Sequence, residues 1–232
     1  MKETVFSLGA RLEACAAFVR EGKVSADIGT DHAYLPIWLV LNGKIPRAYA
    51  SDINEEPIKS ALTNIEKYHL SDKIIVFTAN GLAQIPASEV DDIVIAGMGG
   101  DNIAGILDSV GWIKNPRYRL ILQPMSRAEK LREYLYRHHF DIIAEEPICE
   151  ANRIYTVICA EYSENPLHFS ELDYYIGRLD NHNEYSVKLI QKQAAILQSV
   201  ADGMAVKGDS GNERHYRALS EQLSAYAKGE EV

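Results

Sequence analysis

The chain of 232 residues is long enough for one α/β domain with an appended segment, or for two small domains. Its composition, with 47% hydrophobic and 25% charged residues, is that of an ordinary soluble globular protein. The net charge of −9 argues against a protein coated in basic patches, but it leaves room for a local one.

Strands and helices alternate along the first 140 residues. The hydrophobic pattern predicts helices over 8–22, 33–43, 54–70, 102–113 and 126–140. It predicts strands over 23–29, 47–53, 73–80, 90–100 and 117–125. Asn54 and Ser126 are the expected N-caps of the third and fifth helices. Such alternation predicts a parallel sheet that is covered on both faces by helices.

Two further strands are predicted over 141–151 and 153–162. They are too close together for a crossover helix, so we expect an antiparallel hairpin at the edge of the sheet. Five β-α units followed by a hairpin is the plan of the S-adenosylmethionine-dependent methyltransferases, whereas a Rossmann dehydrogenase usually carries a sixth parallel strand. We therefore expect a Rossmann-like, seven-stranded sheet of the class I methyltransferase type.

The tail after Pro166 has a different pattern, because its apolar residues recur at helical spacing. It predicts a helical hairpin of coiled-coil-like character, with a loop at 207–212. We therefore divide the chain into a methyltransferase domain, 1–162, and a C-terminal helical domain, 163–232.

Cys15, Cys149 and Cys159 are scattered without a metal-binding spacing, and we interpret them as reduced thiols. No apolar run approaches a membrane span, and the N-terminus lacks the apolar segment of a secretion signal. We expect a cytoplasmic protein with no membrane segment and no metal site. The sequence leaves the oligomeric state open, with a monomer favoured.

Four predicted strands end in small, polar or acidic residues. The first is followed by "DIGTDH" (27–32), the second ends at Asp52, the third at Asn80, and the fourth in "AGMGG" (96–100). Ligands of open parallel sheets bind at the carboxyl ends of the strands. An acid such as Asp52 can bond both hydroxyls of a ribose, and the amide of Asn80 can read an adenine edge.

The first of these turns argues for one cofactor over another. A dinucleotide-binding turn needs G-x-G-x-x-G, but here only Gly29 is present. Asp27 and Asp31 would repel a pyrophosphate, whereas they suit the ammonium group of S-adenosylmethionine. The pattern thus favours S-adenosylmethionine and disfavours an NAD-dependent oxidoreductase.

Several segments together, "RLEACAAFV", "ADIGTDHAYLP", "ASDINEEPIKSALTN", "ANGL", "IAGMGG" and "LILQPM", resemble the bacterial tRNA (adenine(22)-N1)-methyltransferase family. The resemblance extends from about residue 5 to 160. It implies S-adenosylmethionine as methyl donor and N1 of an adenine in the tRNA D-arm as acceptor. One departure is Met125, where an asparagine is expected in relatives. The resemblance places the cofactor on Arg11, Asp27, Gly29, Thr30, Asp31, His32, Asp52, Ile53, Asn80, Gly81, Gly97, Met98 and Gly99.

The acceptor chemistry adds candidates for catalysis. An adenine N1 inside a paired stem must be exposed by base extrusion or local opening, after which its lone pair can attack the methyl group directly. The ring becomes cationic, so a nearby carboxylate or an acceptor for the N6 protons would help. Asp31 is the first candidate for this, with binding of cofactor alone as its alternative role. Tyr34 is a candidate for stacking on the base and Gln123 for reading its edge.

Binding of tRNA requires a local basic surface on this acidic chain. Segment 114–137 carries seven lysines and arginines against two glutamates, and we expect Arg127, Lys130 and Arg132 to contact phosphates. The alternative is a solvated helix face with internal ion pairs. Two other functions also stay open: a methyltransferase for another RNA, a protein or a small molecule, and a non-catalytic RNA-binding protein.

Overall fold

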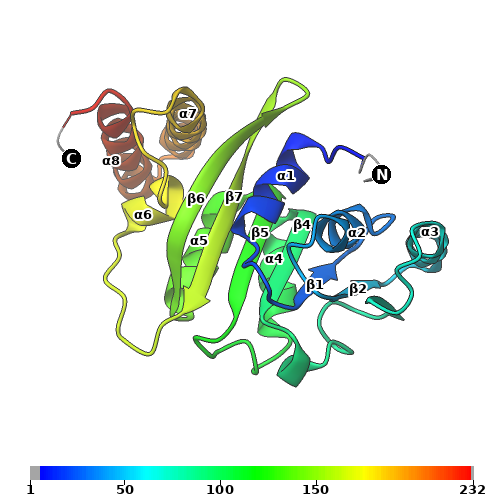
Figure 1. Cartoon of the computed structure of the whole chain (residues 1–232). Helices are drawn as coiled ribbons and strands as arrows, with labels where there is room; N and C mark the ends of the chain where they lie inside the picture. The colour runs from blue at the N-terminus through cyan, green and yellow to red at the C-terminus, as the bar shows by residue number, and fades with distance from the viewer. Residues whose placement is uncertain (1–5, 231–232) are drawn as a thin grey trace.

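The computed structural model describes residues 6–230, and its centre is a seven-stranded sheet (Figure 1). The strand order is β3-β2-β1-β4-β5-β7-β6. The first five strands are parallel, and β7 pairs antiparallel with both β5 and β6. The strands are β1 (Ser25–Ile28), β2 (Ala48–Asp52), β3 (Ile74–Thr78), β4 (Asp92–Gly99), β5 (Arg119–Ser126), β6 (Phe140–Glu150) and β7 (Arg153–Tyr162). The predicted fold, including the terminal hairpin, is confirmed.

Helices cover both faces of this sheet because each inner strand is apolar on both sides. On β4, Ile93 and Ile95 pack in one core with α4 and α5, while Val94 packs in a second core with α1, α2 and α3. The helices are α1 (Ala10–Phe18), α2 (Tyr34–Leu41), α3 (Glu55–Lys67), α4 (Gly100–Asp108) and α5 (Ala128–Arg137), with a 3-10 turn η1 (Ala87–Glu89) before β4. The carboxyl ends of β1, β2, β3 and β4 thus lie side by side in a rigid three-layer domain.

Of the two predicted N-caps, Asn54 is confirmed in position and Ser126 is wrong. Ser126 is the last residue of β5, and α5 begins after Arg127, whose φ of 57° turns the chain into the helix. Asn54 precedes α3 but its side chain makes no capping bond. Its backbone N–H instead donates to Oδ1 of Asp52 at 2.7 Å, so the end of β2 is held by its own acid.

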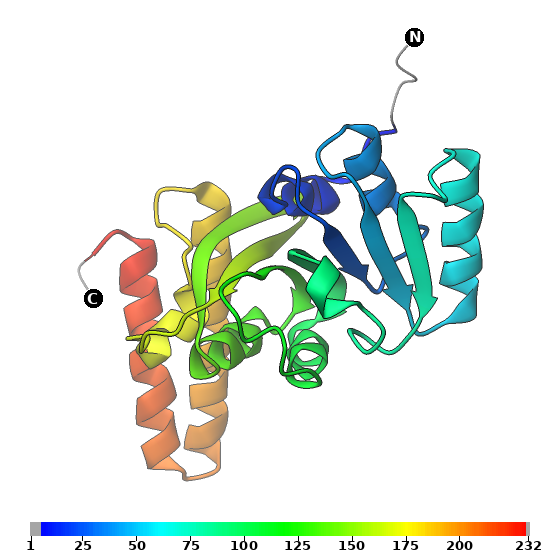
Figure 2. The ribbon, with the colours of Figure 1, turned by 60° about the horizontal axis from the view of Figure 1, so that its bottom comes forward.

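The tail forms α6 (Glu171–Ile176) and a long antiparallel pair, α7 (Glu184–Val206) and α8 (Ser210–Ala227) (Figure 2). The pair buries its own apolar stripe around Ile190, Leu197 and Leu223. The predicted loop at 207–212 is too long, because the Asp209 side chain accepts a bond from Asn212 N and begins α8 early.

A buried ion pair joins the tail to the sheet. Arg132 of α5 bonds Glu145 of β6 at 2.6 Å, and both side chains are almost fully buried. The Arg132 guanidinium also donates to the backbone oxygens of Tyr174 and Tyr175 in α6. The Arg178 N–H, just beyond α6, donates to Glu145. The position of the tail on the sheet is therefore set by hydrogen bonds that converge on a buried ion pair.

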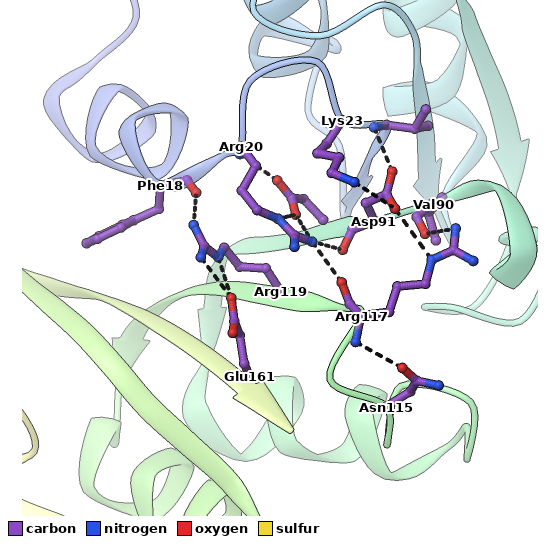
Figure 3. Close-up of polar contacts among 11 residues, drawn as sticks. Phe18, Arg20, Lys23, Val90, Asp91, Asn115, Arg117, Arg119 and Glu161 are labelled. Atoms are coloured by element: carbon purple, nitrogen blue, oxygen red, sulfur yellow. Dashed lines mark hydrogen bonds and ion pairs between the residues drawn. The ribbon is translucent and has the colours of Figure 1, made fainter. Parts of the chain in front are cut away.

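The parallel strands begin along one side of the sheet, its amino-terminal edge, and a dense polar network closes this side (Figure 3). Asp92, at the start of β4, is fully buried and accepts bonds from the N–H and the side chain of Arg20 at 2.6 and 2.7 Å. Arg119 pairs with Glu161 at 2.8 Å, and the Arg117 guanidinium donates to the oxygen of Val90. These groups satisfy one another, so this edge is structural.

Residues 6–230 contain neither a membrane-spanning helix nor a cluster of metal ligands. None of the helices in that range is long and apolar enough to cross a bilayer. Nor do the side chains of these residues gather three potential metal ligands of the His, Cys, Asp or Glu type. Cys15, Cys149 and Cys159 are all free thiols, and Cys15 and Cys159 are buried.

Candidate functional site

The turn after β1 requires a glycine for two reasons. Gly29 has a φ of +75°, and a Cβ added there would lie 2.1 Å from the Cε of Met98. The N–H groups of Gly29 and Thr30 both donate to the oxygen of Ser51 in β2, at 2.7 and 2.9 Å. The turn is thus tied to the neighbouring strand, and its single glycine lets the Met98 side chain approach the backbone.

A large cavity of about 800 Å³ opens beside this turn, at the carboxyl ends of β1 to β4. Its rim carries the Asp52 carboxylate and the Asn80 amide, which come from neighbouring strand ends. The predicted residues that line it are Gly29, Asp52, Ile53, Asn80, Gly81 and Met98. An acid next to an amide in a partly apolar cavity of this size suits a nucleoside.

A second cavity, of about 330 Å³, lies on the other side of Gly29, which lines both. Asp27 and Asp31 lie in its wall, together with Met125 of β5. The predicted residues that line it are Arg11, Asp27, Gly29, Asp31, Tyr34 and Gly97. The two cavities together match a ligand with a nucleoside at one end and a cationic group at the other.

Asp27 is the buried acid of the second cavity. Burial raises its pKa to about 6, and the nearby Asp52 carboxylate adds to the effect. The hydroxyl of the buried Thr30 lies close enough to this carboxylate to lower its pKa in part. A buried carboxylate normally has a charged or polar partner, so Asp27 fits a site that a polar ligand completes.

Gln123 does not face either cavity, which corrects the prediction that it reads the edge of a base. Its side chain is fully buried. Its Oε1 accepts bonds from the Gly97 N–H at 3.1 Å and from Nη1 of Arg11 at 3.0 Å, and its Nε2 donates to the oxygen of Pro124. Gln123 therefore holds the bulged end of β4, where Gly97 has a φ of +81°, against α1.

Arg11 is held at the mouth of the second cavity by three groups. It pairs with Glu150 of β6, bonds Gln123, and its Nη1 lies 3.4 Å from the Met125 Sδ. Its guanidinium also lies over the ring of Tyr155, 5.6 Å from the centroid. Glu150 could not be predicted from the sequence, because a charged residue near a hairpin turn is ordinary.

The remaining catalytic candidates lie on the open side of the second cavity. The Asp31 side chain is 80% exposed, and its Oδ1 lies 3.2 Å from Nε2 of His32. The His32 ring stacks on Tyr34, with 5.3 Å between the centroids. Thr30, His32 and Gly99 line neither cavity, and a Cβ on Gly99 would face Ser126.

The three predicted phosphate contacts lie in different environments. Arg127 and Lys130 are half-exposed, and they pair with Asp101 and Glu133 at 2.6 and 2.9 Å. Arg132 is buried against Glu145, so its guanidinium is taken up by the protein itself. This corrects the expectation that Arg132 contacts RNA.

Comparison with known proteins identifies the family. A family model described as a methyltransferase domain matches residues 8–158. A tRNA (adenine(22)-N(1))-methyltransferase of Bacillus subtilis is 39% identical over 172 residues, which are 74% of this chain and 72% of the relative. The chain belongs to the tRNA (adenine(22)-N1)-methyltransferase family. The predicted family and the predicted enzyme class are therefore confirmed.

Solved structures extend the likeness through the helical tail. A putative tRNA (m1A22) methyltransferase of Streptococcus pneumoniae is 36% identical, with a TM-score of 0.80 over 96% of this chain and 99% of that one. The Bacillus subtilis m1A22 tRNA methyltransferase is 31% identical, with a TM-score of 0.81 over 96% and 98%. The Streptococcus pneumoniae protein has also been solved with S-adenosyl-L-methionine, at a TM-score of 0.79 over 92% and 98%.

Proposed function

We propose that this enzyme transfers a methyl group from S-adenosylmethionine to N1 of adenine 22 in the tRNA D-arm. The observation that carries the proposal is the pair of cavities that meet at Gly29, in a chain of this family. The Bacillus subtilis relative is named for this position and this atom. S-adenosylmethionine, when bound, supplies a methyl group on a sulfonium cation.

The larger cavity is suited to the adenosine part of the cofactor. Asp52 would accept bonds from the two ribose hydroxyls, and Asn80 would bond the adenine edge. In the smaller cavity, Asp27 and Asp31 would hold the ammonium group. Gly29 lines both cavities, and its lack of a side chain leaves only Met98 beside the path between the two parts.

The target adenine would enter from the open side of the second cavity, between Tyr34 and Met125. Tyr34 is 41% exposed and can stack on the base. The Asp31 carboxylate can accept a hydrogen bond from the N6 amino group and offset the positive charge that the ring gains. Gln123 acts indirectly, because its side chain accepts bonds from Gly97 and Arg11 and holds both in place around the site.

The partner that this chemistry requires is a tRNA with the base turned out of its stem. We infer that the enzyme meets it in the cytoplasm, where tRNA is found. Arg127 and Lys130 are the basic side chains of 114–137 that we still assign to RNA, since both are half-exposed. Each would exchange a carboxylate partner for a phosphate on binding.

The two parts of the chain have different tasks in this proposal. All residues that line the two cavities lie within 11–125, so residues 1–162 would bind the cofactor. The tail, 163–232, would help hold the tRNA. A chain ending after residue 163 should keep its cofactor affinity and lose methylation. Because it also loses the bonds from α6 to Arg132, we expect its thermal midpoint to fall.

Methyl transfer to unmodified tRNA transcripts tests the function directly. Transcripts with adenine 22 should gain one N1-methyladenine per molecule. The same transcripts with guanine 22 should gain almost none, because guanine N1 carries a proton. Equal incorporation into both transcripts would place the target at another nucleotide. If calorimetry detects no binding of S-adenosylmethionine to the wild-type enzyme, the cofactor assignment is refuted.

A further inference from the structure

A groove of about 300 Å³ runs between the end of the sheet and the first long helix of the tail. Its walls come from β5, the start of α5, β7 and α7. The lining side chains include Met125, Tyr155, Lys192 and Ile196, together with Arg127 and with Glu129, which accepts a bond from Gln193. Met125 also lines the second cavity, and Arg127 is one of the two residues assigned above to RNA phosphates. The groove therefore lies between the second cavity and the basic helix, where the two parts of the chain meet.

The groove adjoins the second cavity. Met125 lines both of them, and its Sδ lies 3.4 Å from Nη1 of Arg11. The Arg11 guanidinium in turn covers one face of the Tyr155 ring, which lines the groove. A ligand in the groove and a base in the cavity would thus lie on opposite sides of the Met125 side chain.

The walls of the groove have the chemistry of a stacking site. Met125 is 39% exposed and Ile196 is 46% exposed, although both are large apolar side chains. Lys192 lies one helical turn before Ile196 on α7. Within residues 6–230 no carboxylate lies within 4 Å of its Nζ, unlike Arg127 and Lys130, which are paired. Apolar walls beside a free ammonium group suit a flat ring that carries a phosphate.

We propose that this groove binds a nucleotide of the tRNA next to the target adenine, with its base against Met125 and Ile196 and its phosphate at Lys192. The inference rests on the proposed function, since it takes the adjoining cavity as the place of the adenine. Turning a base out of a stem breaks its stacking with its neighbours and costs a few kcal/mol. A stacking site for a neighbour would offset part of this cost and would hold the opened strand.

A double-mutant cycle tests the proposal with the full-length enzyme. One partner is Ile196→Ala, and the other is a transcript that lacks the base at position 21 or at position 23. Loss of the apolar surface that Ile196 would bury against a base is worth about tenfold in binding. Ile196→Ala should therefore lower kcat/KM on the intact transcript about tenfold. On one of the two abasic transcripts, the same substitution should have almost no further effect.

Val206→Ala is the matched control, because Val206 is an exposed apolar residue at the far end of the same helix. It should leave kcat/KM on every transcript unchanged. Lys192→Ala should lower tRNA affinity several-fold and reduce its salt dependence by about one ion. Cofactor affinity should be unchanged in all three variants.

Two outcomes would overturn the groove assignment. One is an equal loss from Ile196→Ala on intact and both abasic transcripts, which would mean a general effect on the fold of α7. The other is full activity of Ile196→Ala and Lys192→Ala on intact tRNA, as expected if the groove binds a peptide instead. Failure of the proposed function itself is distinct, because the wild-type enzyme would then not methylate transcripts with adenine 22.

Discussion

The two edges of the central sheet differ in how their polar groups are satisfied. At the amino-terminal edge, Asp92 is fully buried and accepts two bonds from Arg20, and Arg119 is paired with Glu161. At the carboxyl-terminal edge, Asp27 is buried with a raised pKa and lines an open cavity, and none of the ion pairs among residues 6–230 includes it. The same strands thus end in a closed network on one side and in an incomplete site on the other. Substitutions at the first edge should change stability, and substitutions at the second should change ligand binding.

The largest expected effect on binding comes from Gly29→Ala. The added Cβ would stand between the two cavities and would push the flexible methyl end of Met98 out of its place in the larger cavity, so affinity for S-adenosylmethionine should fall about 100-fold. Gly22→Ala is the matched control, since Gly22 also has a positive φ (+71°) but its Cβ would have nothing within 4 Å in the described residues. Both variants should lose about 1 kcal/mol of stability, and calorimetry should find weak binding in the first alone.

The opposite edge is tested by Asp92→Ala. Loss of a buried carboxylate that accepts two bonds from Arg20 should lower the free energy of unfolding by about 3 kcal/mol, as measured with chemical denaturant. The affinity for S-adenosylmethionine should stay within twofold of the wild-type value. A strong loss of affinity in a folded Asp92→Ala variant would contradict the division between the two edges.

Asp52→Ala removes the acid of the larger cavity. Two charge-assisted bonds to a ribose are worth about 1.5–3 kcal/mol, so the affinity for S-adenosylmethionine should fall about 10- to 100-fold. The variant Glu56→Ala, which loses only an exposed pair with Lys59, should bind normally. An unchanged dissociation constant for Asp52→Ala would remove Asp52 from the site.

The raised pKa of Asp27 gives the site a pH dependence. Its pKa of about 6 lies above the ordinary 3.8. Between these two pH values, Asp27 is therefore protonated in the folded protein and ionised in the unfolded chain. Stability therefore falls as pH rises from about 4 to 6, by about 3 kcal/mol in all. Cofactor binding has the opposite trend, because the ammonium group needs the ionised acid. Affinity should fall up to tenfold for each pH unit below 6, and Asp27→Asn should abolish both trends in titration experiments.

The smallest effect is expected at the basic helix. Replacing Arg127 and Lys130 together by alanine should weaken tRNA binding a few-fold and lower its salt dependence by about two ions. Cofactor affinity should not change, because neither residue lines the two cofactor cavities. A salt dependence equal to that of the wild type would show that these pairs belong to a solvated surface.

The site residues that the strand pattern alone predicts lie at or just beyond the ends of parallel strands, whereas Arg11 was predicted only from the family resemblance. Asp52 ends β2 and Asn80 follows β3, and the geometry of a parallel sheet brings such ends together whatever the rest of the chain does. Gln123 and Arg132 could not be placed in this way. Their partners, Arg11 and the α6 carbonyls, lie 112 and 42 residues away, so only tertiary packing decides that both side chains are buried.

The order and type of the strands and helices could be predicted from the sequence, but their exact ends could not. Alternating strands and helices determined the sheet and its hairpin, while the ends of the elements depended on single contacts. The start of α8 depends on the Asp209 side chain, and the start of α5 on the backbone of Arg127. Neither local effect alters the hydrophobic period, and so neither was visible in the pattern.

The buried pair of Arg132 and Glu145 has a consequence for how a substrate is selected. A tail tied to the sheet through a dry ion pair cannot swing, so α7, a helix of 23 residues and about 35 Å, projects from the catalytic domain at a fixed angle. Such an enzyme selects substrates by the distance between two points of contact. An RNA must offer the target adenine at one point and a helical stem at another, at the correct separation, to engage both at once. We therefore expect a short stem-loop with the same local sequence to bind at only one of the two points and to be a poor substrate.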